Sequence, residues 1–462
     1  MEDVSALLAR ARALDAQGRN EDARRAYLEL LAANPEHFEA LGLLGNLLVK
    51  LGHRAAARAA FAQAARVRPG SASAHANLAT LLCDDDTAGA IEHYEIALRL
   101  EPDHRSAHCG LAILLLRTGR LDAAREHGRA GGMGAAVAWP YRGAEPPVSL
   151  LVVVSAIGGN VPFDAFLDDR VFRKWTLAPE LFDPDGALPP HDLVFNTIGD
   201  ADLCGPSLDA AAAVLSRTNA PVLNRPERVR PTGRAANAER LRSVPGVVTA
   251  HTREWSREAL EAPGAADALR RDGFEWPLLL RSPGFHTGEQ FVKVDEPSAL
   301  PGAVAGLPGP TLLVLQYVDT RGPDGMFRKY RAMFVDGQLY PLHLAVSPRW
   351  KVHYFSADMA ERPDHRAADE AFLKDMPGTV GEQAMQTLEA IRAALGLDYG
   401  GMDFGLRDGH VVLFEANATM VIVQPPDDPR WAYRVAPVER VKQAVQRMLL
   451  RAAGRLDRVP TL

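Results

Sequence analysis

The sequence contains little cysteine, and the cysteines it has form no binding pattern. Cys83, Cys109 and Cys204 are scattered through 462 residues without a CxxC spacing. We therefore expect a reducing compartment, with neither a disulfide framework nor a zinc knuckle. The N-terminus, MEDVSALLARARALDAQG, is acidic and then amphipathic, so it does not resemble a secretory signal. The predicted location is cytoplasmic.

Two further absences narrow the function class. No apolar run is long enough to span a bilayer, so no membrane partner is expected. The formal net charge of −6 argues against a protein that binds nucleic acid over a large surface, although a local basic site stays open. An apolar fraction of 47% and a charged fraction of 24% are typical of a soluble globular protein. The length predicts about three domains.

The first part of the sequence contains internal repeats. Pro35, Pro69 and Pro102 close helical stretches at intervals of 34 and 33 residues. Between the first two prolines lies the pattern Leu41-x2-Leu44-Gly45-x2-Leu48, followed by Ala57-x3-Phe61. Looser copies flank it, with the matching positions Leu14, Ala23, Tyr27, Leu78, Ala90, Tyr94, Leu111, Leu115, Gly119 and Ala124. The pattern resembles tetratricopeptide repeats over residues 1–130.

This resemblance implies an array of paired helices. Small alanine and glycine positions let the helices of a pair approach, and large residues fill the seam between pairs. Such arrays usually bind a peptide or protein segment on their concave face. A scaffold for dimerisation, or for packing on the rest of the chain, is an equal alternative. The stretch from Gly128 to Pro147 is rich in Gly, Ala and Pro, which predicts a linker over residues 131–147.

After residue 147 the periodicity changes from helical to mixed. Short β-branched runs alternate with helical stretches, which predicts a small open α/β unit followed by an α+β region. The expected strands are 148–154, 192–196, 222–223, 278–281, 311–318, 329–335 and 338–345. The expected helices are 207–217, 235–242, 382–395 and 437–452.

The stretch GGMDFGLRDGHVVLFEANAT, from Gly400 to Thr419, predicts a hairpin that carries two acids and an amide. With a two-residue Asp408-Gly409 turn, Asp403 points away from Glu415 and Asn417, because side chains alternate between faces. With a three-residue loop that includes Arg407, Asp403 shares a face with both of them. The second arrangement is the one that brings three oxygen donors together.

Hard oxygen donors on one face suit Mg²⁺, which binds one or two carboxylates plus phosphate oxygens. Two buried carboxylates without a cation would repel each other and raise each other's pKa. The alternative is that Asp403, Glu415 and Asn417 are solvent-facing polar positions on a half-exposed hairpin. Spacing alone leaves the two readings evenly matched.

The spacing of Asp403, Glu415 and Asn417 resembles the metal-binding signature of ATP-grasp ligases. In that signature a Glu follows an Asp by twelve residues and an Asn follows the Glu by two, near the C-terminus. That superfamily includes glutathione synthetase and the ribosomal-protein glutamate ligases. Other stretches stand in the order that the resemblance requires: DLVFNTIGDAD, APVLNRPERV, WPLLLRSPGFHTGEQFVKV, LLVLQYVD and FRKYRAMFVDGQLYPL. The resemblance implies a pre-ATP-grasp α/β domain at 148–223 and an α+β ATP-grasp domain at 224–455, with ATP and Mg²⁺ as cofactors.

The resemblance also implies roles for the cations and for the glycine-rich loop. Arg281 ends a buried strand, where its charge is costly without an anion, and a structural ion pair is the alternative. Arg234 and Arg281 stand where the family usually has lysine and would bind phosphate. The loop residues expected to cover the phosphates are Gly284, His286, Thr287 and Gly288.

The remaining site residues come from three other stretches. Gln316, Tyr317 and Val318 would frame adenine, although an ordinary core strand explains them almost as well. Arg331 alternates with apolar neighbours and would reach the phosphates or the reaction intermediate. Lys351 belongs to a basic cluster with Arg349 and His353 that would meet a carboxylate substrate or form a solvated strand.

Together these features predict an ATP-dependent carboxylate–amine ligase that acts through an acyl phosphate, with Arg331, Arg281 and Lys351 as its catalytic residues. The substrates would be a small-molecule carboxylate and an amine, or a peptide or protein docked on the repeats. The first rival is a non-catalytic adaptor whose C-terminal part is only a nucleotide-binding scaffold, and the second is an ATP-grasp phosphotransferase. The sequence does not decide whether the chain forms a homodimer, as many members of the superfamily do.

Overall fold

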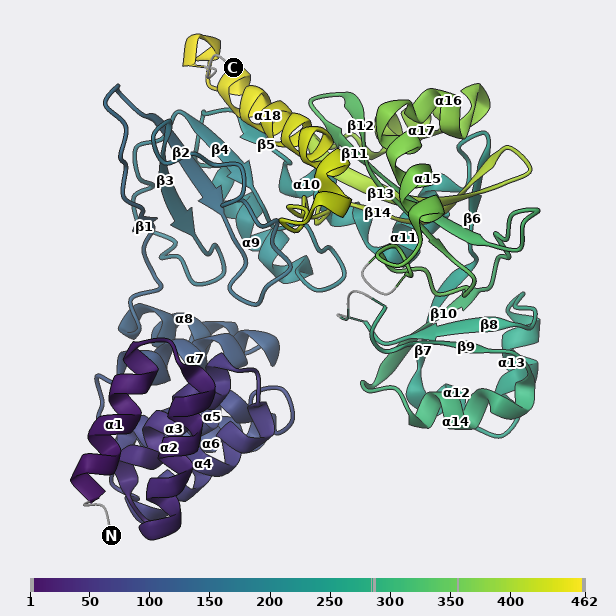
Figure 1. Ribbon diagram of the computed structural model, residues 1–462. Coiled ribbons are helices and arrows are strands. Elements are labelled where there is room, and N and C mark those ends of the chain that lie inside the picture. Colours follow the sequence, from purple (N-terminus) through teal and green to yellow (C-terminus); the bar gives the residue numbers. More distant parts are fainter. Residues whose placement is uncertain (1–3, 284, 286–287, 355–356, 459–462) are drawn as a thin grey trace. The chain divides into compact units, whose positions relative to one another are not determined.

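The structure is a computed structural model that describes residues 4–283, 285, 288–354 and 357–458 (Figure 1). Gly284, His286 and Thr287, which were expected to cover the phosphates, lie outside the described residues. The chain divides into two compact units, Met1–Ala136 with Glu180–Ala187, and Val137–Pro179 with Leu188–Leu462. The short segment 180–187 therefore belongs to the N-terminal unit, although it follows the first strands in sequence.

Within its described residues the N-terminal unit is helical, and each helix packs against the next along the chain. Its helices are α1 (Val4–Ala16), α2 (Asn20–Ala33), α3 (Phe38–Lys50), α4 (Arg54–Val67), α5 (Ala72–Leu82), α6 (Thr87–Leu100), α7 (Arg105–Arg117) and α8 (Leu121–Ala130). α2, α4 and α6 each end two residues before a proline, at Pro35, Pro69 and Pro102. Proline disfavours helical geometry in the residue before it, which fixes these three ends.

Small residues set the distance between neighbouring helices of this unit. A Cβ atom at Gly45 of α3 would lie 2.6 Å from the ring of Phe61 in α4. A Cβ atom at Gly110 of α7 would lie 2.2 Å from the ring of Tyr94 in α6. Four alanines in the second helices of successive pairs are fully buried: Ala23, Ala57, Ala90 and Ala124. The repeat positions identified in the sequence are thus the packing positions.

The second unit begins with a sheet of order β1-β3-β2-β4-β5. Its strands are β1 (Val137–Ala138), β2 (Val148–Val153), β3 (Phe172–Leu177), β4 (Leu193–Asn196) and β5 (Val222–Leu223). All pairs are parallel except β1 with β3. β2 and β4 are almost continuously buried, as expected for parallel strands covered on both faces. α9 (Gly205–Leu215) connects β4 to β5.

Two largely antiparallel sheets follow. The second sheet has the order β7-β10-β8-β9, with β7 (Thr252–Ser256), β8 (Leu278–Arg281), β9 (Phe291–Val294) and β10 (Thr311–Gln316). The third has the order β12-β11-β13-β14-β6, with β6 (Val247–Thr249), β11 (Phe327–Val335), β12 (Gln338–Ser347), β13 (Tyr399–Arg407) and β14 (His410–Asn417). Among the described strand pairs of the third sheet, β14–β6 is parallel and the others are antiparallel.

The helices of this unit divide it into two cores. α18 (Val435–Ala452) packs on β4, β11 and β12, and its valines and leucines join the first and third sheets into one apolar cluster. The second sheet has a separate core with α12 (Arg257–Glu261), α13 (Ala265–Arg271) and α14 (Leu300–Ala305). The remaining α-helices are α10 (Pro226–Val229), α11 (Arg234–Leu241), α15 (Pro363–Lys374), α16 (Met376–Val380) and α17 (Glu382–Leu395).

Most elements expected from periodicity are present, and the errors have local causes. The strand 278–281 and the helix 382–395 have the predicted ends, and α18 begins two residues earlier than predicted. β3 was missed because FRKWTL carries two cations and is only partly buried. The segment 131–147 is not only a linker, because β1 lies in it and pairs with β3. Four short 3-10 helices, at 230–232, 297–299, 429–434 and 456–458, complete the described elements.

Candidate functional site

A row of polar side chains crosses the third sheet. Directly opposed residues on β12, β11, β13 and β14 are, in that order, His343, Arg331, Asp403 and Glu415. Residues that face each other on neighbouring strands project from the same face, so these four side chains lie side by side. Lys329 and Asn417 lie two residues from Arg331 and Glu415 along their strands and share this face. The structure therefore brings both acids, the amide and two cations together.

The hairpin reaches this arrangement through a bulge, and not through a longer loop. Arg407 faces His410 across a two-residue turn in which Asp408 has φ 51° and Gly409 has φ 77°. The three-residue loop considered in the sequence is therefore wrong. The register instead shifts between Asp403 and Phe404, which leaves Phe414 as the extra residue, 43% exposed. This bulge turns Asp403 toward the face of Glu415.

Asp403 is buried and fully ion-paired. Its side chain is 1% exposed, Arg331 Nε lies 2.6 Å from Oδ1, and Arg331 Nη2 lies 2.7 Å from Oδ2. Lys329 Nζ lies 2.7 Å from Oδ2. Burial alone would raise the pKa of Asp403, but the charges of Arg331 and Lys329 hold the pKa well below its usual range. Asp403 is therefore ionised, and its charge is neutralised by strand β11.

The charge of Glu415 is neutralised by Arg234, which comes from α11 and not from β11. Its Oε1 accepts hydrogen bonds from Arg234 Nη2 and from Asn417 Nδ2, both at 2.9 Å. Arg234, the first residue of α11, also donates from Nη1 to Asp202 at 2.9 Å. Burial lowers the pKa of Arg234, but Glu415 and Asp202 more than offset that effect, so its pKa is raised. Arg234 thus connects the loop before α9 to the hairpin.

Arg281 brings a further cation toward this region from the second sheet. It ends β8, and its Nη2 donates to the backbone oxygen of Phe285. Its Nε is buried and makes no hydrogen bond among the described residues. Burial and the neighbouring charge of Arg234 both lower the pKa of Arg281. A buried donor beside a like charge is costly, and an anionic ligand would relieve both costs.

Lys351 lies against the end of the glycine-rich loop. Its Nζ donates to the backbone oxygen of Phe291 at 3.1 Å, so the side chain is tied to β9. Gly288 has φ +77°, and a Cβ atom there would lie 2.8 Å from Lys351 Cε. A glycine at this position permits both the left-handed backbone and the close approach of the lysine. A role of Lys351 in catalysis stays a prediction.

The residues expected to frame adenine lie at the end of β10. The side chain of Gln316 exchanges two hydrogen bonds with the backbone of Glu275, at 2.8 and 2.9 Å. The ring of Tyr317 has Lys293 Nζ 4.5 Å from its centroid, and Val318 is half-buried. Gln316 thus holds the chain before β8 in place. Adenine binding by these residues stays a prediction.

The donor set fits Mg²⁺ in its chemistry, but its oxygens already have partners. Two ionised carboxylates and an amide oxygen on one face are ligands that Mg²⁺ prefers. Asn417 Oδ1 accepts from the backbone and the hydroxyl of Thr419, at 3.0 and 2.9 Å. Among the described residues, no group of three or more His, Cys, Asp or Glu is placed to hold a metal ion. A metal would therefore have to exchange places with the cations that now pair with Asp403 and Glu415.

A cavity of about 160 Å³ opens beside the row. Charged and polar lining comes from β11, β12, the end of the 3-10 helix at 429–434 and the segment after β12: Lys329, Arg331, His343, His353 and Arg434. The rest of its described lining is mostly apolar: Leu342, Tyr354, Ala357, Met359, Ala360, Val421, Val423, Gln424, Pro426 and Trp431. Arg331, a predicted site residue, is part of the lining of this cavity.

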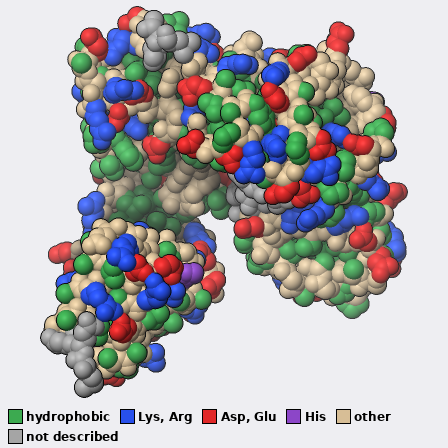
Figure 2. All heavy atoms as spheres, in the orientation of Figure 1, with side chains coloured by type: hydrophobic (Ala, Val, Ile, Leu, Met, Phe, Trp, Pro, Cys, Tyr) green, Lys and Arg blue, Asp and Glu red, His purple; other side chains and the backbone are tan. Residues whose placement is uncertain are grey.

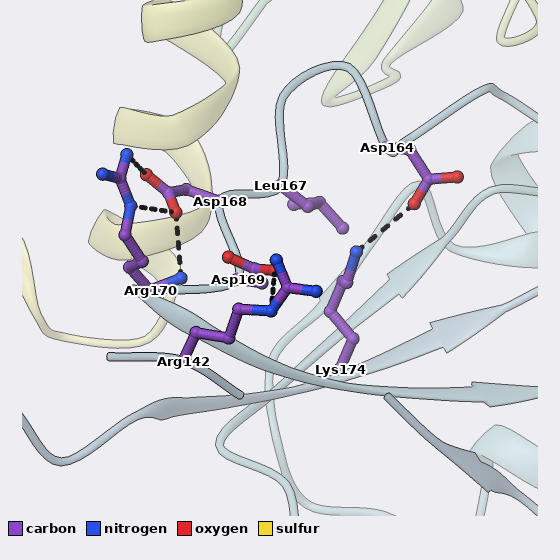
Figure 3. Close-up of a pocket in the computed structure, with 7 residues that line it drawn as sticks. All are labelled: Arg142, Asp164, Leu167, Asp168, Asp169, Arg170 and Lys174. Atoms are coloured by element: carbon purple, nitrogen blue, oxygen red, sulfur yellow. Dashed lines mark hydrogen bonds and ion pairs between the residues drawn. The ribbon is translucent and has the colours of Figure 1, made fainter. Parts of the chain in front are cut away.

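A larger cavity, of about 520 Å³, lies around β3 of the first sheet. Figure 3 shows that its charged side chains pair with one another. The pairs are Arg142 with Asp169, Arg170 with Asp168, and Lys174 with Asp164. Each of the three cations in the described lining thus has an acid within 3.5 Å, so the charges of this cavity offset one another. The candidate site is therefore the polar row of the third sheet.

Asp369 on α15 supports the wall of the smaller cavity and predicts a pH dependence. It accepts hydrogen bonds from the Leu344 backbone at 2.7 Å and from the Tyr433 hydroxyl at 2.6 Å, and it lies 3.7 Å from Arg434 Nε. Burial raises the pKa of Asp369 to about 6. Because the folded protein then holds this proton more tightly than the unfolded chain, its contribution is most favourable near pH 4 and is lost as the pH rises to 6.

We expect the free energy of unfolding to fall by up to about 3 kcal/mol from this group between pH 4 and pH 6. Urea unfolding of the wild type and of Asp369→Asn across this range measures it. The variant should lack this component, because asparagine does not titrate. Parallel curves for the two proteins would contradict the assignment.

Several residues of the site were not identified in the sequence. Lys329 could have been found, because it alternates with Arg331 along FRKYR and therefore shares its face. His343, Asp369 and Arg434 gave no local signal, because each belongs to the site only through contacts between distant segments. Asp202 likewise enters only through its pair with Arg234.

Comparisons with known proteins bear on the N-terminal part of the chain. Residues 14–82 and residues 84–132 match two models described as Tetratricopeptide repeat. The N-terminal unit contains tetratricopeptide repeats. This confirms the prediction made from the spacing of its prolines, leucines and alanines, and it identifies a module of the type that binds peptides or proteins. The tetratricopeptide-repeat segment is followed by a mixed α/β region with several sheets.

Among solved structures, the chain is similar to one described as the crystal structure of MamA protein, with 22% identity over 28% of this chain and 70% of that chain, and a TM-score of 0.27. MamA 41-end from Desulfovibrio magneticus RS-1 is 24% identical over 28% of this chain and 74% of its own, with a TM-score of 0.27. YrrB, described as a TPR protein with an unusual peptide-binding site, is 22% identical over 28% and 68%, with a TM-score of 0.26.

No curated protein matches the chain. Within the described part of the chain, none of the helices combines the length and the hydropathy that a bilayer span requires.

Proposed function

We propose that residues 148–455 form an ATP- and Mg²⁺-dependent carboxylate–amine ligase, with a pre-ATP-grasp domain at 148–223 and an ATP-grasp domain at 224–455. The observation that carries the proposal is the polar row of the third sheet. Asp403 and Glu415 face each other there, and the cations that pair with them come from β11 and α11. Phosphoryl transfer needs this combination, because acids bind the metal and cations bind the phosphates.

The position of Arg281 gives further support. It ends β8 in the second sheet, yet its pKa responds to the charges of Arg234 and Glu415 near the third sheet. Charges from two sheets with separate cores thus act on one region. A nucleotide held between two such lobes would contact both, which matches the arrangement that the resemblance to ATP-grasp ligases implies.

In the proposed reaction, a substrate carboxylate oxygen attacks the γ-phosphorus of ATP. The bond from that phosphorus to the β–γ bridging oxygen breaks, and ADP leaves. An amine then attacks the carbonyl carbon of the acyl phosphate, phosphate departs with its bridging oxygen, and the nitrogen loses a proton to give an amide.

The chain's own residues position these groups. Arg234 and Arg281 would hold phosphate oxygens, and Arg331 would hold the carboxylate as it becomes an acyl phosphate. Asp403, Glu415 and Asn417 would hold Mg²⁺, which supplies charge neutralisation for phosphoryl transfer when it is bound. Phosphate oxygens would give Arg234 and Arg331 new partners, and Asp403 and Glu415 would then be able to hold the metal.

This exchange predicts that Mg²⁺ and ATP bind together. Without nucleotide, Asp403 and Glu415 keep their cations, so Mg²⁺ alone is expected to leave the melting temperature nearly unchanged. Mg²⁺ with ATP at about 100 times its dissociation constant should stabilise by about 2.7 kcal/mol, or roughly 4 °C for a unit of this size. Differential scanning fluorimetry of the full chain measures both. An equal shift with Mg²⁺ alone would show that Asp403 and Glu415 bind the metal without nucleotide to draw their arginine partners away, which would contradict the exchange.

We further propose that the tetratricopeptide repeats dock a peptide or protein, either as the substrate or as its carrier. Lys and Arg side chains are interspersed with Asp and Glu on the face of this unit that Figure 2 shows. A mixed surface of this kind favours a peptide of mixed charge over a polyanion.

Product analysis tests the ligase function. The full chain is incubated with ATP, Mg²⁺ and pooled carboxylic acids and amines, and ADP release and product mass are measured. A ligase gives a product that contains both substrates and no phosphorus. A phosphorylated product would assign the protein as a phosphotransferase instead. Calorimetry that detects no ATP binding would favour the adaptor.

A further inference from the structure

The cavity of about 160 Å³ beside Arg331 carries an excess of positive charge. Lys329, Arg331 and Arg434 line it, and no Asp or Glu belongs to its described lining. The acids that pair with these cations, Asp403 and Asp369, lie behind the wall and are 1% and 0% exposed. An anion that enters the cavity would therefore meet three cations and no exposed acid.

Two nearly buried side chains in the lining each have a nitrogen without a hydrogen bond to any described residue. The side chain of Arg434 is 5% exposed, and its Nε makes no hydrogen bond among the described residues, its nearest acid oxygen being 3.7 Å away in Asp369. His343 is 7% exposed, and its Nδ1 also makes none. Unsatisfied buried polar groups are rare, and each destabilises the folded protein. Carboxylate oxygens would supply the missing acceptors.

Most of the remaining described wall is apolar. Leu342, Met359, Val421 and Trp431 face the same space as the cations. A cavity of about 160 Å³ is small beside the roughly 300–1,000 Å³ of pockets that bind drug-sized ligands. The ligand that fits this lining is a small molecule with a negative end and a compact apolar body.

The charge of the cavity also discriminates between acids. A free amino acid carries an ammonium group next to its carboxylate. With no acid in the described lining, that ammonium would approach Lys329, Arg331 and Arg434 without a counter-charge. An acid without the ammonium avoids this cost.

We propose that this cavity is the site of the carboxylate substrate, and that the substrate is a small acid with an apolar body and no adjacent ammonium group. Its carboxylate lies toward Arg331, Lys329 and Arg434, and its apolar body lies against Val421 and Trp431. As a substrate site, this inference rests on the proposed ligase function. The acid itself binds without nucleotide, so the two claims are tested separately.

Isothermal titration of the full chain without nucleotide tests the site with three probes of one shape. 4-Methylpentanoate has the carboxylate and the apolar body, leucine adds the ammonium, and 3-methylbutylamine has the ammonium alone. We expect 4-methylpentanoate to bind at least about tenfold more tightly than leucine, a difference of 1.4 kcal/mol. The amine should give no heat. Equal affinity for leucine and 4-methylpentanoate would overturn the proposal.

Variants locate the binding. Val421→Phe fills the cavity and leaves its cations in place, so it should lose 4-methylpentanoate binding while its circular dichroism stays unchanged. Arg434→Met should weaken binding at least about tenfold. Arg451→Met, on α18 and outside the lining, is the matched control and should bind as the wild type does. Wild-type affinity in Val421→Phe would contradict the site.

The same proteins separate this inference from the ligase proposal. If 4-methylpentanoate binds as expected and no acid in the pool releases ADP, the binding site stands and the ligase function fails. If ADP is released with acids that bind Val421→Phe as tightly as the wild type, the ligase function stands and this assignment of the cavity fails.

Discussion

Glu415→Gln is expected to lower acid-dependent ADP release by at least about 10²–10³-fold while the fold stays intact. Glutamine can still accept the hydrogen bonds of Arg234 and Asn417 that Glu415 Oε1 accepts at 2.9 Å. What it loses is the negative charge that the proposed Mg²⁺ site needs. Glu415→Ala should have the same effect on turnover. The measurement is coupled-enzyme detection of ADP, with circular dichroism to verify folding.

Glu389→Gln provides the matched control for this substitution. Glu389 also pairs with an arginine, Arg392 at 2.7 Å, but it lies on α17 and its side chain is 46% exposed. Its replacement should leave ADP release unchanged. Wild-type turnover in Glu415→Gln would remove the ligase interpretation of the polar row.

Asp403→Asn is expected to have the largest effect on stability. It leaves Arg331 and Lys329 beside a neutral side chain that is 1% exposed in the wild type. Removing one partner of a buried ion pair typically costs about 3–5 kcal/mol, because the remaining charge is uncompensated. Urea denaturation, followed by fluorescence, measures the loss. Asp403→Asn combined with Arg331→Met should recover part of it, since the double variant removes one uncompensated charge.

Asp364→Asn distinguishes burial from ion pairing as the cause. Asp364 pairs with Arg362 at 2.7 Å, but the two side chains are 60% and 53% exposed. Exposed pairs contribute little, so no measurable change in stability is expected. A loss in Asp403→Asn as small as that in Asp364→Asn would show that the polar row contributes no more than a surface pair.

The tetratricopeptide repeats were predictable because their signal is local and periodic. Proline at positions 35, 69 and 102 follows a helical stretch and ends it, since its effect on the preceding residue needs no tertiary partner. The buried alanines recur at the same interval because each fits the same helix–helix contact. Four repetitions of one pattern outweigh the ambiguity of any single position.

The hairpin of β13 and β14 could be predicted only in part from the sequence. Alternation along β14 places Glu415 and Asn417 on one face, and the structure agrees. The side on which Asp403 lies depends on a bulge at Phe414. A bulge depends on how the two strands pair, and FEAN carries no residue that requires one. The sequence therefore allowed a two-residue and a three-residue loop. The actual loop has two residues, which by alternation alone would place Asp403 on the face opposite to Glu415.

Pairing between distant residues was the least predictable part of the site. Arg331 and Asp403 are 72 residues apart, and Arg234 and Glu415 are 181 residues apart. Their partnership follows from the strand order β12-β11-β13-β14 and from the position of α11. The sequence could name each residue as charged and partly buried, but only the topology shows that both predicted acidic metal ligands, Asp403 and Glu415, already have an arginine beside them.

A crystal structure of the full chain with ADP and Mn²⁺ tests the central claim most directly, because manganese substitutes for magnesium and gives an anomalous signal. We predict an anomalous peak within bonding distance of Asp403 and Glu415, with Arg331 or Arg234 moved from a carboxylate to a phosphate oxygen. Nucleotide bound elsewhere, or metal absent from this face while both arginines keep their present partners, would contradict it.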